Sequence, residues 1–189
     1  MKNIAVFASG TGSNFQAIIQ AVKMQQLKAN IALLVSDKPQ CGAVEIAKSN
    51  GIEVFTFSAK AFENKEAYEQ AILLELRQHQ VDYLILAGYM KLIGNVLLSS
   101  YPMKIINLHP ALLPAFPGAH GIADAFNYGV KVFGITIHYV DAGVDTGAII
   151  DQYAFHIEEG ESVEDVERRI HALEHQYYPV TIHRVLNEE

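Results

Sequence analysis

Cysteine, clustered basic residues and long apolar runs are all scarce in this chain of 189 residues. The single cysteine, Cys41, excludes an internal disulfide framework, and nothing near it resembles a thiolate or metal-binding pair. This usage is typical of a reducing compartment, so we expect a cytoplasmic protein. No stretch approaches the roughly 18 apolar residues of a membrane span. Residues 3–8 also form too short an apolar run for a signal peptide, so no membrane partner is expected.

Positive charge is also in short supply. Fourteen basic residues stand against 21 acidic ones, giving a formal net charge of -7, and the basic residues are scattered along the chain. A protein that binds a polyanion needs a basic face, because neutralised phosphates supply most of the affinity. We therefore expect small-molecule substrates and no nucleic-acid partner. Scattered lysines would still suffice to hold one small anion.

What the chain does contain is an alternation of short apolar runs and amphipathic stretches. Strands are predicted at residues 3–8, 31–36, 53–57 and 83–87. Helical patterns lie between them, around residues 15–22, 43–50 and 66–78. Such alternation predicts βαβ units and an α/β fold with a doubly wound, mostly parallel central sheet. Half of the residues are hydrophobic, which suits one globular domain.

The second half of the chain departs from this alternation. After a strand at residues 104–108 come a proline-rich loop and a short helix around Ile122 to Tyr128. A pair of strands follows at residues 132–139 and 148–157. A long C-terminal helix is expected to begin near Ser162, with Pro179 kinking or ending it.

The most informative feature is Asn107-Leu108-His109-Pro110, at the end of the strand at residues 104–108. Side chains two apart on a strand point the same way, so an amide donor and a titratable ring leave one face together. A carboxylate nearby would favour the charged ring, and Asp145 lies in an acidic glycine loop downstream. Together the three side chains match the needs of acyl transfer without a covalent enzyme intermediate.

Each of these residues also has a simpler interpretation. The chain has eight histidines, and most histidines in proteins are structural or solvated. Asp141 and Asp145 stand among glycines, where an acid often only shapes a turn. The spacing of Asn107 and His109 at a strand tip favours the catalytic interpretation.

A second candidate site follows the first predicted strand, at Ser9-Gly10-Thr11-Gly12-Ser13-Asn14. This loop opens a helix, whose positive end and free backbone N–H groups favour an anion. The loop lacks the lysine of a P-loop, so a single phosphate group fits best, although a plain glycine turn remains the alternative. Asp37 stands where a nicotinamide-binding protein carries its ribose-binding acid, so a dehydrogenase is the second interpretation.

Over essentially its whole length the chain resembles the phosphoribosylglycinamide formyltransferases, folate-dependent enzymes of purine synthesis. The motifs that carry the resemblance are Gly12-Ser13-Asn14, Ala87-Gly88-Tyr89-Met90, Asn107-Leu108-His109-Pro110 with Leu112-Leu113-Pro114, Phe116-Pro117-Gly118, and His138-Tyr139-Val140-Asp141 running into Gly143-Val144-Asp145-Thr146-Gly147.

The resemblance implies a Rossmann-like formyltransferase fold in one domain, residues 1–189. Residues 1–100 would be its phosphate-binding half and residues 101–189 its catalytic and folate-binding half. It implies catalysis by Asn107, His109 and Asp145. It implies that the acceptor, glycinamide ribonucleotide, is held by Gly12, Ser13, Asn14, Lys65, Gly88 and Glu174. It also implies that the co-substrate 10-formyltetrahydrofolate is held by Met90, Lys91, Leu92, Val140 and Asp141.

No metal is implied, and a monomer or weak homodimer is expected. Lys65 stands where some relatives carry arginine, which keeps the charge but loses bidentate geometry. Glu174, taken without the family, is equally well a solvent-facing acid of the C-terminal helix. Three alternatives remain: another transferase or hydrolase that uses formyl-folate, such as methionyl-tRNA formyltransferase, the dehydrogenase suggested by Asp37, and a nucleotide-binding or folate-binding module that keeps the fold without the activity.

Overall fold

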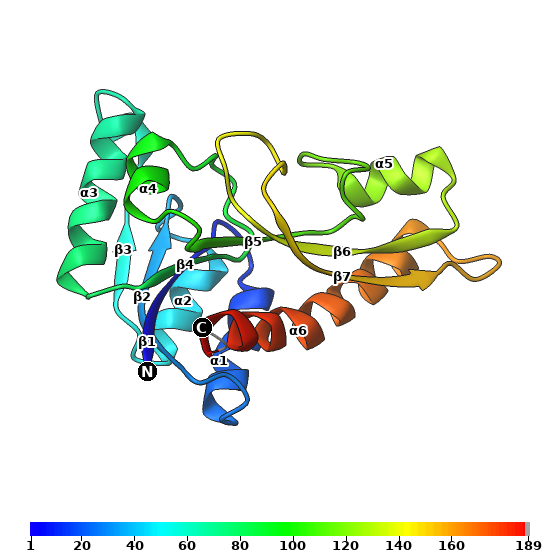
Figure 1. Ribbon diagram of the computed structural model, residues 1–189, viewed down its shortest axis with the longest axis horizontal. Coiled ribbons are helices and arrows are strands. Elements are labelled where there is room, and N and C mark those ends of the chain that lie inside the picture. Colours follow the sequence, from blue (N-terminus) through cyan, green and yellow to red (C-terminus); the bar gives the residue numbers. More distant parts are fainter. Residues whose placement is uncertain (188–189) are drawn as a thin grey trace.

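The computed structural model describes residues 1–187, which form seven strands in one sheet, in the order β3-β2-β1-β4-β5-β6-β7 (Figure 1). The strands are β1 (Lys2–Phe7), β2 (Ala29–Ser36), β3 (Val54–Thr56), β4 (Tyr83–Leu86), β5 (Ile105–His109), β6 (Val132–Tyr139) and β7 (Ile149–His156). The first five are parallel, whereas β6 runs antiparallel to β5 and β7 antiparallel to β6. The predicted α/β class, the mostly parallel sheet and the C-terminal strand pair are confirmed.

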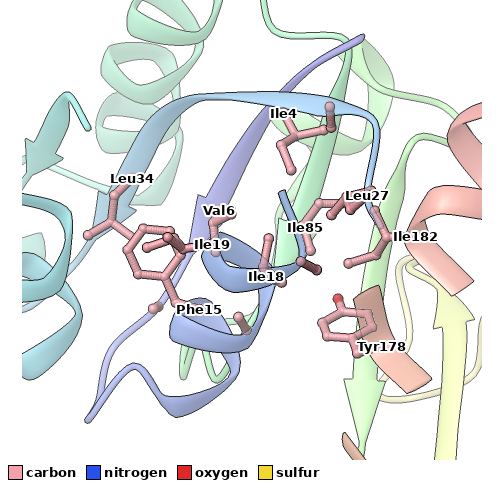
Figure 2. Close-up of a cluster of buried hydrophobic side chains, with 14 of the residues drawn as sticks. Ile4, Val6, Phe15, Ile18, Ile19, Leu27, Leu34, Ile85, Tyr178 and Ile182 are labelled. Carbon is pink, nitrogen blue, oxygen red and sulfur yellow. The ribbon is translucent and has the colours of Figure 1, made fainter. Parts of the chain in front are cut away.

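Helices cover both faces of this sheet. They are α1 (Ser13–Lys23), α2 (Gly42–Ser49), α3 (Lys65–Gln78), α4 (Asn95–Ser100), α5 (Gly121–Tyr128) and α6 (Val163–Asn187), with a short 3₁₀ helix, η1 (Ala59–Ala61). One buried cluster joins β1 to α1, α2 and α6, and Figure 2 shows its side chains, including Ile4, Ile18 and Tyr178. A second cluster joins the other side of β1, through Phe7, to α3 and α4. Successive side chains of β1 point to opposite faces of the sheet, so this strand contributes to both hydrophobic clusters, as expected for a sheet covered by helices on both faces.

At two helices the structure goes beyond the prediction. Helix α4 was not predicted, because six residues are too few to show a 3.6-residue period. Pro179 does not end the C-terminal helix, which continues to Asn187. Tyr178 and Ile182 are fully buried on either side of the proline, and their packing offsets the hydrogen bond that proline cannot donate. Among residues 1–187, no helix has the length and apolarity needed to cross a bilayer.

The strand order fixes where a ligand can sit. Strands β2 and β3 are added on one side of β1, whereas β4 and β5 are added on its other side. The strand order therefore reverses between β1 and β4, and the carboxyl ends of these two strands flank a topological switch point. The glycine loop follows β1, Gly88 follows β4, and Asn107 and His109 end β5. Three stretches that are far apart in sequence therefore meet at one edge of the sheet.

Candidate active site

A pocket of about 440 Å³ opens at this edge of the sheet. It is lined by residues from the glycine loop, the stretch after β4, the end of β5, the loop between β6 and β7, and α6. The lining includes every predicted site residue except Lys65: Gly12, Ser13, Asn14, Gly88, Met90, Lys91, Leu92, Asn107, His109, Val140, Asp141, Asp145 and Glu174. The fold therefore brings the proposed catalytic, acceptor and folate residues around one cavity.

The glycine loop reaches α1 through Gly12, whose backbone is left-handed with φ 83°. A side chain at this position would meet the Cα atom of Ala43 at 2.8 Å, so both the conformation and the close approach require glycine. Within residues 1–187, no side chain caps this end of α1. The first backbone N–H groups of a helix have no partner within it, so those of Ser13 and Asn14 remain available to an anion in the pocket.

His109 is 3% exposed and its two ring nitrogens face different oxygen atoms. Its Nε2 lies 2.7 Å from the carbonyl oxygen of Phe116, which can only accept, so Nε2 carries a hydrogen. Its Nδ1 lies 3.4 Å from Oδ2 of Asp145. That separation exceeds an ordinary N–H···O hydrogen bond, so the Nδ1 side is not firmly committed to the carboxylate.

Asp145 is held by the backbone around it. Its φ of 54° is left-handed, a region that aspartate and asparagine tolerate better than most residues. The backbone N–H of Gly118 donates to its Oδ2 over 2.7 Å. The carboxylate thus ties the loop after β6 to the proline-bounded loop after β5, and it faces the His109 ring. Asp145 therefore does more than shape a turn.

Asp141 fits the simpler interpretation more closely. Its Oδ1 accepts hydrogen bonds from the Thr146 hydroxyl over 2.6 Å and from the Gly143 backbone over 3.0 Å. These bonds, the Thr146 bond first, hold the pKa of the Asp141 carboxyl below its ordinary value. Asp141 shapes the loop between β6 and β7 and also lines the pocket, so its contact with the folate remains a prediction.

Sequence reasoning missed His138 as a site residue. It is 2% exposed and lies opposite Asn107 in the β5–β6 pairing. The Asn107 side-chain nitrogen lies 3.2 Å from Nε2 of His138. A signal was present, since Thr136 and His138 are polar residues at alternate positions of an otherwise apolar strand. Thr136 uses its hydroxyl to bind Ala111 and Leu113, which anchors the proline-bounded loop.

Glu174 is not the solvent-facing acid of the simpler interpretation. Its residue is 5% exposed, and Oε2 accepts from the Asn14 amide over 3.1 Å and from Nδ1 of His171 over 2.9 Å. The hydrogen bond to Glu174, joined by the charges of Glu174 and Glu167, raises the pKa of His171. The network joins α1 to α6 beside the glycine loop, and it leaves Asn14 Oδ1 buried without a partner among the described residues.

Two residues lie outside the pocket lining. Lys65 begins α3 and its side chain lies beside Gly94. Its role at a phosphate stays a prediction. Asp37 accepts a hydrogen bond from the Ser9 hydroxyl over 2.5 Å, and that hydroxyl in turn accepts from the Met90 backbone over 3.0 Å. Asp37 thus supports the pocket wall after β4, which is formed by residues 88–93.

Glu69 fixes the C-terminal end of the pocket wall after β4. It is 2% exposed, and its Oε1 accepts from the backbone N–H of Gly94 over 2.5 Å, at the start of α4. Burial raises the pKa of the Glu69 carboxyl, against the hydrogen bonds from Gly94 and Leu97 and the charge of Lys65, which lower it. A carboxylate therefore fixes the backbone next to Met90 to Ile93.

Substitution of Glu69 is expected to separate hydrogen bonding from charge. Glu69→Ala leaves the part-buried N–H of Gly94 without its carboxylate partner and should lower the free energy of unfolding by about 1 to 3 kcal/mol. Glu69→Gln keeps an acceptor and removes the buried charge. The pKa of Glu69 in the folded protein is raised above its ordinary value of 4.5. The contribution of the wild-type carboxyl to the free energy of unfolding is therefore fully present below pH 4.5 and is lost as pH rises through the folded pKa.

The stability of Glu69→Gln relative to wild type should therefore increase as pH rises above about 4.5 and through the folded pKa of Glu69. Urea unfolding of the three proteins at several pH values measures this. A difference between Glu69→Gln and wild type that is constant with pH would contradict the role of the buried charge.

Comparisons with known proteins agree with the motifs. The sequence profile described as formyl transferase matches residues 2–182. The chain is 54% identical over 186 residues to the phosphoribosylglycinamide formyltransferase of Bacillus subtilis, covering 98% of this chain and 95% of that protein. It is 35% identical over 180 residues to the Escherichia coli enzyme of the same name, covering 95% and 85%. The crystal structure of phosphoribosylglycinamide formyltransferase from Bacillus halodurans superposes with a TM-score of 0.96 at 48% identity, covering 99% and 96% of the two chains.

Proposed function

Because this chain belongs to the formyl transferase family, we propose that it transfers the formyl group of 10-formyltetrahydrofolate to the amine of glycinamide ribonucleotide, a step of purine biosynthesis. The observation that carries the proposal is the meeting of Asn107, His109 and Asp145 in the pocket that the glycine loop also lines. Family membership and full-length similarity rank this reaction above the dehydrogenase alternative.

The acceptor is assigned to the side of the pocket formed by the glycine loop and Glu174. The N–H groups at the start of α1 suit its phosphate. Asn14 Oδ1, which has no partner in the described part of the chain, offers an acceptor for a donor group of the same ligand, and such a bond would remove the cost of a buried unsatisfied oxygen. Both features make this side suitable for an anionic ligand that also carries hydrogen-bond donors.

The folate is assigned to the wall after β4 and the loop after β6. Met90, Leu92 and Val144 line the pocket and are 66%, 61% and 45% exposed. Apolar side chains left open beside polar backbone suit a flat ring system with hydrogen-bonding edges. This surface adjoins Asp141 and Asp145, so a ligand seated here would place its formyl group near His109.

Chemistry starts with attack by the glycinamide amine on the formyl carbon, and the carbonyl electrons move to oxygen. The Asn107 amide and the protonated His109 ring stabilise that oxyanion. Nδ1 is the ring atom available for this, since Nε2 donates to Phe116. Asp145 orients the ring and holds a water that moves the amine proton to the folate nitrogen. The bond from that nitrogen to carbon then breaks and the carbonyl re-forms.

The direct test is an assay of formyl transfer from 10-formyltetrahydrofolate to glycinamide ribonucleotide with the purified protein. A heat-stability measurement with formyl-folate or NAD added provides an independent readout, since a ligand stabilises the fold that binds it. Transfer together with protection by formyl-folate supports the proposal. Absence of transfer, or protection by NAD alone, would reject it.

Lys65→Ala is expected to raise the acceptor Michaelis constant more than it lowers turnover, because a phosphate contact exists before the reaction starts. Steady-state kinetics with varied glycinamide ribonucleotide measure both constants. Lys65→Arg keeps the charge and serves as the matched control. An unchanged acceptor constant in Lys65→Ala would remove Lys65 from the phosphate site.

A further inference from the structure

The geometry points to His138 as a positioning residue that fixes the orientation of the Asn107 amide, so that an N–H group faces the pocket. The inference rests on the proposed function, which gives that N–H an oxyanion to bind. His138 and Asn107 are direct cross-strand partners in the β5–β6 pairing. The sheet itself therefore holds the two side chains in register.

The hydrogen bonds of His138 determine which nitrogen carries its hydrogen. Nδ1 lies 2.8 Å from the carbonyl oxygen of Tyr139, which can only accept, so Nδ1 is the donor. In the neutral ring Nε2 then has a lone pair and no hydrogen. The Asn107 Nδ2 group, 3.2 Å away, donates to that lone pair. Rotating the amide by half a turn would instead place its oxygen against the lone pair, which is repulsive.

Asp145 is the competing partner for His138. Its Oδ1 lies 3.6 Å from Nε2, beyond hydrogen-bond range, and an ion pair would require a hydrogen on Nε2. That hydrogen would point at the N–H groups of Asn107 and force the amide to turn round. The nearer contacts of Asp145 are made by its other oxygen, Oδ2, which accepts from Gly118 and faces His109. The shorter contact therefore assigns Nε2 to Asn107.

One amide hydrogen remains for the substrate. The Asn107 nitrogen carries two hydrogens, one of which is used by His138. Asn107 lines the pocket, and within residues 1–187 its side chain forms no other hydrogen bond. The hydrogen bond between Asn107 and His138 orients the free N–H group. The His138 ring is itself fixed, because it is 2% exposed and its Nδ1 is bonded to Tyr139. An amide without this bond would present either its nitrogen or its oxygen to the reacting carbonyl.

Two substitutions of nearly equal size separate the two nitrogens of the ring. Gln at position 138 places an amide oxygen near the site of Nε2, so His138→Gln keeps the acceptor for Asn107. Asn reaches only the site of Nδ1, so His138→Asn keeps the Tyr139 bond and loses that acceptor. We expect His138→Asn to lower kcat by about 10- to 100-fold, because small misplacement of a reacting group has effects of this size. We expect His138→Gln to stay within about 3-fold of wild type, and neither to change the acceptor Michaelis constant more than about 2-fold.

A double-substitution cycle shows whether His138 acts through Asn107. In the Asn107→Ala background, His138→Asn should cause little further loss, whereas in the Asp145→Asn background its effect should persist. Equal kcat values for His138→Asn and His138→Gln would overturn the inference. It would also be overturned by a loss that survives in Asn107→Ala and disappears in Asp145→Asn.

Nitrogen-15 NMR of histidine-labelled wild-type protein tests the same point without any variant. The expected result is a neutral His138 ring with its hydrogen on Nδ1. A ring with its hydrogen on Nε2, or on both nitrogens, would overturn the inference even if the variants failed to fold. Absence of formyl transfer by the wild type would reject the proposed function, and the NMR result would still decide the amide orientation.

Discussion

Asn107→Ala is expected to reduce turnover by about 10²- to 10³-fold, which corresponds to roughly 3 to 4 kcal/mol of activation free energy. The oxyanion would lose a preorganised donor in a site where His109 is almost fully buried. Water that replaced the amide would have to be ordered during the reaction. Steady-state kinetics on the formyl-transfer reaction give the measurement, with the effect on kcat rather than on the acceptor Michaelis constant.

The fold should tolerate this substitution, because Asn107 is only half-buried and its amide bonds one side chain, that of His138. Asn30→Ala is a suitable control, since Asn30 is an exposed amide that bonds Asn3 away from the pocket. The control should keep wild-type turnover. Near-normal turnover in Asn107→Ala would remove the amide from the mechanism.

Asp145→Asn is expected to lower turnover by about 10²- to 10⁴-fold while the fold stays intact. The new amide oxygen can still accept the Gly118 hydrogen, and asparagine tolerates the left-handed backbone at this position. What disappears is the negative charge that lies 3.4 Å from Nδ1 of His109 and orients the ring. The ring would then be held by the Nε2 bond to Phe116 alone, and Nδ1 would lose the charged partner that positions it towards the oxyanion.

Asp145→Ala provides the comparison. Alanine loses both the charge and the Gly118 bond, and the left-handed conformation costs it about 1 to 2 kcal/mol. We therefore expect Asp145→Ala to lower turnover and the free energy of unfolding together, whereas Asp145→Asn lowers turnover alone. If Asp145→Asn retained turnover within a few-fold of wild type, the carboxylate would not be the group that prepares His109.

Local patterns in the sequence were sufficient for most of the architecture. The apolar runs that became β1, β2, β4 and β5 are short and continuous, as strands covered on both faces must be, and their ends were placed within two residues. Where the pattern was weak the prediction failed. Helix α4 has six residues and depends on the buried Glu69, which lies 25 positions earlier in the chain.

The candidate site likewise contains residues that local sequence patterns identify and contacts that they do not. Asn107 and His109 were recognisable because both lie on one strand, where a two-residue spacing determines the face. The contact between His109, at the end of β5, and Asp145, in the loop after β6, spans 36 positions of sequence. Only the antiparallel return of β6 brings the two residues together. His138 was overlooked because its partner lies on another strand, and the sequence of one strand does not determine its register with its neighbour.

The sequence by itself determined which segments become strands and helices, because apolar periodicity and glycine placement act over a few residues. It also supplied the chemical groups of the pocket. The tertiary structure alone decided which groups meet: Glu174 with Asn14 across 160 positions, Asp145 with Gly118, and His138 with Asn107. The physical reason is that hydrogen bonds require donor and acceptor within about 3 Å, and such distances between remote segments are fixed only by packing the whole sheet and its helices.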